Sequence, residues 1–219
     1  MEDWQAHLIE QTRNFVQSAL RDAESGHDWW HIFRVWKLAE KIAREEKADL
    51  FVVSLGALLH DIADAKFYKG DETIGPRRAQ QFLQKQNLPE EIIRKVLNII
   101  RYVSFKNRDE IPEENSKELH IVRDADRLDA IGAIGIARAF SFGGFKKREM
   151  YNPSVPPRLG MTKEEYKKNE GTTVNHFYEK LFLLKDMMHT PAGKRLAEER
   201  HRFMEQYLEE FYAEWQGEK

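Results

Sequence analysis

The sequence predicts an all-α protein, a single domain of about nine helices that spans residues 1–219. Apolar residues recur at helical spacing over long stretches, and capping residues, glycine or proline separate these stretches. No stretch alternates apolar and polar residues as a half-buried strand does. With 219 residues, 41% of them hydrophobic, the chain can bury a substantial core.

The chain begins with two amphipathic helices. Residues 4–23 carry apolar side chains on one side, and Gly26 can end this first helix. Asp28 can cap the second helix. His27 and His31 are four residues apart, so they lie near the same helical face. Beside two tryptophans, this pair fits aromatic packing as well as a functional site, and both interpretations stay open at this point.

The most informative stretch is the apolar helix expected over residues 50–59, with Asp49 as its N-cap. A helix that is apolar on all sides is buried on all sides. The stretch is followed by a histidine, two carboxylates and a lysine, namely His60, Asp61, Asp64 and Lys66. Because buried ionisable groups are costly unless they are paired or bind a metal, this is the first place to expect chemistry.

The remaining helices are expected at about 74–86, 89–104, 120–140, 162–188 and 190–215. The segment 120–140 contains Gly132 and Gly135, which are poor helix formers and indicate close approach to another helix, with Gly56 as a candidate contact. Residues 141–160 are predicted to be a long loop. Its basic run 146–148 suits either a phosphate or a solvated surface.

The segment 120–140 also carries three carboxylates. Asp126 and Asp129 share one face at helical spacing. Asp124 lies about 200° from Asp126 around the helix, so we expect it to face solvent beside a neighbouring arginine. The pair Asp126 and Asp129 fits a charged outer face, although the small and apolar residues around it favour a functional site.

Composition limits the partners. The net charge of −2 provides no basic field that would attract a nucleic acid polymer or an anionic membrane. Cysteine is absent, and no apolar run is long enough for a membrane span. The N-terminus is acidic and amphipathic, unlike that of a signal peptide. We therefore expect a soluble, cytoplasmic, globular protein. The sequence leaves the oligomeric state open, and a homodimer is one option.

Three separated segments offer metal-ligand residue types, namely His31, the pair His60 and Asp61, and Asp126. Two imidazoles and two carboxylates suit one six-coordinate divalent ion such as Mn²⁺, Co²⁺, Ni²⁺ or Mg²⁺, with water in the open positions. Asp64, one turn beyond Asp61, could take a proton from such a water. Candidates for neutralising substrate phosphates are Lys66, Lys180, His176 and His27.

The ordered pattern of His31-Ile-Phe-Arg-Val, then Leu-Leu-His60-Asp61-Ile, then Ala-Asp126-Arg-Leu-Asp resembles the HD-domain superfamily of metal-dependent phosphohydrolases. This resemblance covers about residues 20–140. The patterns around His27, His60 and His176 are similar to the YpgQ/YedJ-like bacterial subgroup over most of the chain.

The resemblance implies one divalent metal bound by His31, His60, Asp61 and Asp126, with His27 as the competitor for the first position. Asp64 stands where some members carry a catalytic glutamate, and it is shorter by one methylene. The extra histidines of two-metal members are missing, which implies a mononuclear site. The C-terminal helices, about 162–216, are expected to complete the substrate pocket.

The resemblance implies cleavage of a (deoxy)nucleoside triphosphate to a monophosphate and pyrophosphate. In this hypothesis Asp64 positions or deprotonates the attacking water, while Lys66 and Lys180 offset the phosphate charge. The enzymatic alternatives are a nucleoside monophosphatase and a cyclic-dinucleotide phosphodiesterase. The non-enzymatic alternative is a helical signalling or scaffold module.

Overall fold

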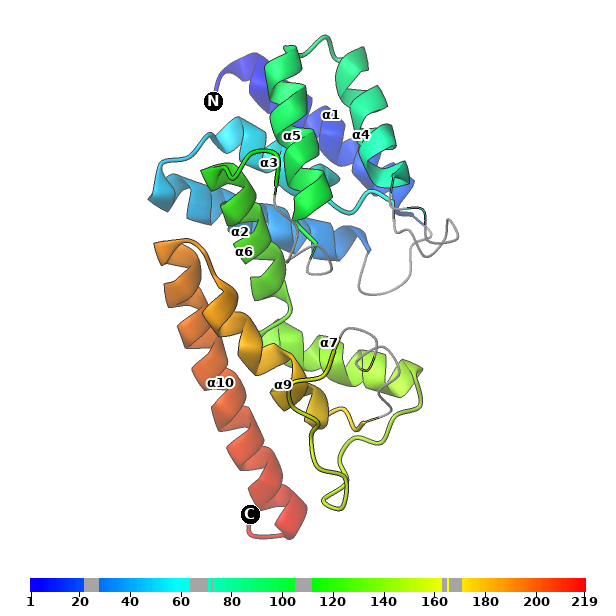
Figure 1. Ribbon diagram of the computed structural model, residues 1–219, viewed down its shortest axis with the longest axis vertical. Helices are drawn as coiled ribbons and strands as arrows, with labels where there is room; N and C mark the ends of the chain where they lie inside the picture. Colours follow the sequence, from blue (N-terminus) through cyan, green and yellow to red (C-terminus); the bar gives the residue numbers. More distant parts are fainter. Residues whose placement is uncertain (22–27, 64–70, 72, 105–111, 163–164, 166–170) are drawn as a thin grey trace. The chain divides into compact units, whose positions relative to one another are not determined.

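The regular structure of the protein is helical, as a computed structural model shows for residues 1–21, 28–63, 71, 73–104, 112–162, 165 and 171–219 (Figure 1). These residues contain no strand and form nine α-helices and one 3₁₀-helix, which confirms the all-α prediction. The helices are α1 (Asp3–Ala19), α2 (Trp29–Glu46), α3 (Leu50–Leu59), α4 (Ile74–Lys85), α5 (Glu90–Tyr102), α6 (Lys117–Asp129), α7 (Gly132–Phe145), α9 (Asn175–Glu179), η3 (Leu181–Met187) and α10 (Pro191–Gln216).

The described residues divide into two compact units. The first unit contains Met1–Asp126 and His189–Gly193, and the second contains Arg127–Met188 and Lys194–Lys219. The expectation of one domain over residues 1–219 stays a prediction. No single helix in the described part of the chain has both the length and the apolar composition of a membrane span.

The centre of the first unit is α3, which packs against α1, α2 and α5, while α4 lies beside α5 (Figure 1). Nine of its ten residues, from Phe51 to Leu59, are buried, as expected for a helix that is apolar on all sides. Gly56 allows α5 to approach, because a Cβ there would lie 2.8 Å from Ile99 Cδ1. The close approach at Gly56 therefore involves Ile99. The expected contact of Gly56 with Gly132 or Gly135 stays a prediction.

The N-cap of α3 provides a stability test. The Asp49 carboxylate accepts hydrogen bonds from the backbone N–H groups of Phe51 and Val52, at 2.9 and 3.1 Å. Asp49→Ala leaves both donors without this acceptor and should lower the free energy of unfolding by about 1 kcal/mol, as measured by urea denaturation. Asp49→Ser retains a capping oxygen and is the control. Equal losses in the two variants would contradict the capping role.

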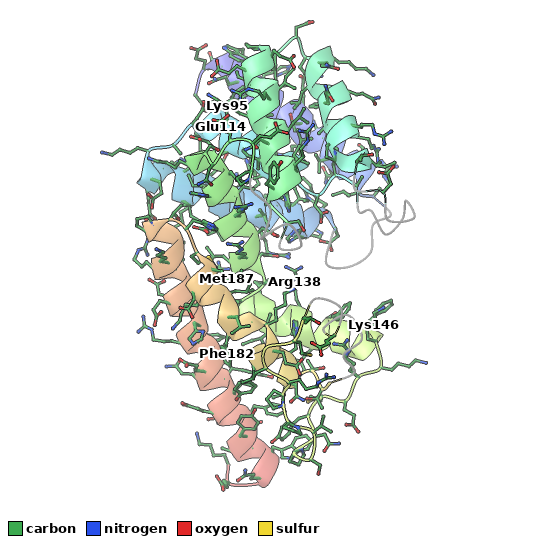
Figure 2. All side chains as sticks on the ribbon, in the orientation of Figure 1. Lys95, Glu114, Arg138, Lys146, Phe182 and Met187 are labelled. Carbon is green, nitrogen blue, oxygen red and sulfur yellow. The ribbon has the colours of Figure 1, made fainter. Side chains whose placement is uncertain are left out.

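The second unit has an aromatic core at α7, α9, η3 and α10. Phe177 of α9 is fully buried, and its ring lies 6.0 Å from Phe140 and 6.3 Å from Tyr207, measured between centroids. The ring of Phe182 of η3, which is labelled in Figure 2, contacts the rings of Phe177 and of His201 in α10, with centroid distances of 6.3 and 4.8 Å. These contacts fix the short α9 against the long α10.

The expected helix over 120–140 is interrupted. It ends at Asp129 and a second helix begins at Gly132, because Gly132 has a φ of +76°, which favours glycine. A side chain at Gly132 would also meet Arg200 of α10, whose Cγ would lie 2.9 Å from the added Cβ. Gly132 therefore serves a turn and a helix contact within the second unit.

Two boundaries differ from the sequence prediction. The expected loop over 141–160 begins later, because α7 continues through Gly143 to Phe145. The expected helix over 162–188 is, in its described part, the short α9 followed by η3. The helical backbone is interrupted at Lys180, with φ −144° and ψ −53°. With the helix broken at Lys180, Phe177 of α9 and Leu184 of η3 are both buried in the aromatic core.

Candidate metal centre

Asp28 fixes the first turn of α2 and with it His31. Its Oδ1 atom accepts a hydrogen bond from the backbone N–H of His31 at 2.9 Å, so Asp28 is the N-cap that the sequence predicts. The His31 residue is 3% exposed. Its ring lies edge-on to the ring of His60, with centroids 5.4 Å apart. The capped start of α2 and the end of α3 thus bring two imidazoles together.

His60 lies at the carboxyl end of α3, and its tautomer follows from one hydrogen bond. Its Nδ1 atom lies 2.8 Å from the Ala57 carbonyl oxygen, which can only accept, so Nδ1 carries the proton. The Nε2 atom is buried and has no hydrogen-bond partner among the described residues. In the neutral ring this atom carries a lone pair. A buried imidazole whose second nitrogen is held by a carbonyl is the usual arrangement of a metal ligand.

Asp126 of α6 supplies the carboxylate. Its Oδ1 atom lies 3.4 Å from His31 Nε2 and 3.9 Å from His60 Nε2. One ligand atom from each of the three residues lies within 4.8 Å of the other two. Two ligands of one ion, each at about 2.0–2.2 Å, lie at most about 4.4 Å apart, so small side-chain rotations suffice to bind an ion. All three residues belong to the first unit.

The donor set fits a divalent cation. Imidazole nitrogen with carboxylate oxygen suits first-row divalent ions, and three protein ligands leave positions for water or substrate. Asp61, the fourth predicted ligand, is half-buried and lies outside the group of three. The structure therefore brings together three of the four predicted ligands, and the role of Asp61 stays a prediction.

The roles of the other five predicted site residues stay predictions. His27, Asp64 and Lys66 lie outside the described residues, so their roles stay predictions. His176 is in α9 and Lys180 follows that helix, both in the second unit. Burial, together with the charges of Lys180 and Arg148, lowers the pKa of His176 to about 3. His176 is therefore neutral at pH 7, where it can donate or accept a hydrogen bond but brings no positive charge.

The pKa of His176 predicts a pH-dependent stability. An unfolded histidine titrates near pH 6.5, whereas His176 in the folded protein titrates near 3. Between these values the unfolded state binds more protons, so stability rises with pH and is lost as the pH falls below 6.5. In His176→Gln, the decrease in unfolding free energy between pH 7.5 and 5.5 should be smaller by up to about 1 kcal/mol. Urea denaturation at the two pH values measures it, and equal decreases would contradict the prediction.

The expectation that Asp124 faces solvent is wrong. Asp124 is fully buried, and both of its oxygens accept hydrogen bonds from the segment His189–Gly193. Burial alone would raise the pKa of this carboxyl, but hydrogen bonds from His189 and Thr190 outweigh it, so the pKa lies below its usual range. Helical periodicity gives the angle between Asp124 and Asp126. It contains no signal that a segment 65 residues later covers the opposite side of α6.

Comparison with known proteins supports this site. The HD domain family matches residues 29–131, a range that contains all three grouped residues. The chain is 42% identical over 202 residues to the uncharacterized protein YpgQ of Bacillus subtilis, covering 91% of this chain and 89% of that protein.

Solved structures agree over almost the whole length. An HD-superfamily hydrolase from Bacillus thuringiensis matches with a TM-score of 0.79 and 42% identity, covering 97% of this chain and 98% of that one. YpgQ of Bacillus subtilis, solved in complex with ADP, matches with a TM-score of 0.74 and 37% identity, covering 96% of both chains. The chain therefore belongs to the HD-domain superfamily of hydrolases.

Proposed function

We propose that the protein is a metal-dependent phosphohydrolase that acts on nucleotides, and that it cleaves (deoxy)nucleoside triphosphates to monophosphate and pyrophosphate. The observation that carries the proposal is the group of His31, His60 and Asp126, with the Nε2 atom of His60 buried and without a hydrogen-bond partner. The ADP complex of the similar protein YpgQ supports a nucleotide as the class of substrate.

The residues of this chain have separate tasks in the proposal. His31, His60 and Asp126 hold the ion. Asp61 adds a fourth ligand in this proposal. A divalent ion at this place supplies Lewis-acid polarisation of a phosphoryl oxygen and lowers the pKa of water. The Ala57 carbonyl keeps the proton of His60 on Nδ1, so that Nε2 stays available.

In this proposal, other residues take the proton of the water and offset the charge of the phosphates. Asp64 positions or deprotonates the attacking water, and Lys66 and Lys180 offset the charge of the phosphates. His27 and His176 contact the substrate. Because His176 is neutral, its contribution is a hydrogen bond.

The test is hydrolysis of a nucleotide panel with Mn²⁺, Co²⁺, Ni²⁺ or Mg²⁺, followed by identification of the products. Nucleoside triphosphates should yield pyrophosphate and a monophosphate. Release of orthophosphate from monophosphates would identify a monophosphatase, and a linear dinucleotide would identify a phosphodiesterase. If the protein binds the metal but hydrolyses none of these nucleotides, the result would contradict the proposal and favour a signalling or scaffold role.

The proposed role of Asp64 in proton transfer can be tested by substitution. Asp64→Asn should retain the metal and lower kcat on the order of a hundredfold, because the amide cannot accept the proton of the water. Asp64→Glu, which has the longer carboxylate, is the matched control and should retain more activity than the asparagine variant. Equal kcat values in Asp64→Asn and the wild type would exclude Asp64 from proton transfer.

A further inference from the structure

We propose that Asp124 is a positioning residue, which, through its hydrogen bonds to the segment His189–Gly193, sets the place of α6 and thereby of the ligand Asp126. The inference rests on the metal site of the proposed function. It assigns a role in that site to Asp124, two residues before the ligand Asp126, and to Thr190 and Gly193, which are distant from the ligands in sequence.

The hydrogen bonds of Asp124 use both carboxylate oxygens. Oδ1 accepts from the backbone N–H of His189 at 2.9 Å, and the His189 ring Nδ1 lies 3.3 Å away. Oδ2 accepts from the backbone N–H of Thr190 and from its hydroxyl, each at 2.8 Å. Asp124 has no exposed surface. A buried carboxylate with this many donors has a strongly defined position.

The segment His189–Gly193, which supplies these donors, has an internal hydrogen bond and packs closely against Asp124. The Thr190 hydroxyl donates to Asp124 and also accepts from the backbone N–H of Gly193 at 2.9 Å. A Cβ added at Gly193 would lie 2.8 Å from Asp124 Cγ, so only glycine leaves room for the carboxylate. On the same face of α6, His120 stacks on His189 with centroids 4.4 Å apart.

A second contact holds α6 from another side. Arg123 is buried, and its Nε atom donates to the carbonyl oxygen of Tyr102 at 2.7 Å. Asp124 and Arg123 are neighbours and point about 100° apart. Together they determine both the rotation of α6 and its position along its axis.

Asp126 depends on this placement. It lies about 200° from Asp124 around α6, and its side chain is 26% exposed. The helix backbone therefore decides where its carboxylate meets the two imidazoles. Ligand positions in a metal site have a tolerance of about 0.5 Å, so a small rotation of α6 would weaken binding. The Asp124 hydrogen bonds therefore affect metal binding through the position of α6.

The experiment measures Mn²⁺ affinity by titration calorimetry, together with thermal stability, for a matched pair of variants. Thr190→Val removes the hydroxyl that donates to Asp124, and Thr190→Ser keeps it. We expect Thr190→Val to bind Mn²⁺ about tenfold more weakly and Thr190→Ser to bind within about twofold of the wild type. Asp124→Asn and Gly193→Ala, which disturb the same contact from its two sides, should weaken binding by about 10- to 100-fold.

Val16→Ala is the control for general destabilisation, because Val16 is fully buried in α1, which carries no ligand. It should lower the melting temperature and leave Mn²⁺ affinity unchanged. If Thr190→Val and Asp124→Asn lose stability but bind Mn²⁺ as the wild type does, the positioning role is overturned. Wild-type protein that binds Mn²⁺ without hydrolysing nucleotides would count against the proposed function alone.

Discussion

His60→Ala is expected to abolish metal binding and to lower kcat/KM by on the order of a thousandfold or more. The variant removes the imidazole whose Nε2 atom is buried without a hydrogen-bond partner and lies 3.9 Å from Asp126 Oδ1. The remaining members of the group, His31 and Asp126, with Asp61 as the further proposed ligand, cannot hold an ion as firmly as the full set. Elemental analysis after gel filtration should find about one Mn²⁺ per wild-type chain, and far less in the variant.

The fold should survive this substitution, which separates loss of metal from loss of structure. In the metal-free state, His60→Ala and the wild type should have similar circular dichroism. Added Mn²⁺ should stabilise the wild type by about 2.7 kcal/mol at a free concentration one hundred times its Kd, and the variant hardly at all. His7→Ala, which removes an exposed imidazole of α1, is the matched control. Unchanged metal content in His60→Ala would remove His60 from the site.

Local chemistry explains why α3 and the start of α2 were predictable, whereas the metal group was expected from the resemblance of the ordered histidine and aspartate pattern to the HD-domain superfamily. The run from Leu50 to Leu59 is apolar on every side, and the Asp49 cap depends on residues two and three positions later. Likewise, Asp28 predicts the start of α2 and therefore the place of His31 within its first turn. These signals act within one helical turn, so a single sequence contains them.

Contacts between distant segments explain the errors. The break before Gly132 combines a positive φ with the approach of Arg200, 68 positions away. The helical spacing of apolar residues predicts neither feature. Asp124 was assigned to solvent because nothing near it in sequence points to Thr190. In both cases the deciding partner comes from the C-terminal part of the chain, which no local pattern connects to α6 or α7.

The stability of the second unit should depend strongly on its aromatic core. Phe177→Ala should lower the free energy of unfolding of this unit by about 3–5 kcal/mol, because it removes a fully buried ring and leaves a cavity. The ring of Phe177 lies parallel to that of Tyr207, with an interplanar angle of 11°. With five residues, α9 is too short to be stable alone, so it depends on this packing.

Phe142→Ala is the matched control, because it makes the same substitution at a side chain that is 51% exposed in α7. It should change stability by no more than about 0.5 kcal/mol. Urea denaturation followed by circular dichroism measures both variants. Equal losses in Phe177→Ala and Phe142→Ala would contradict the assigned core.

Metal content should separate Phe177→Ala from His60→Ala. His31, His60 and Asp126 all belong to the first unit, whereas Phe177 belongs to the second. Phe177→Ala should therefore lose stability and retain its Mn²⁺ under native conditions, while His60→Ala should lose Mn²⁺ and retain the stability of the second unit. If Phe177→Ala also loses its Mn²⁺ while still folded, metal binding depends on the aromatic core, and the three ligands of the first unit do not suffice.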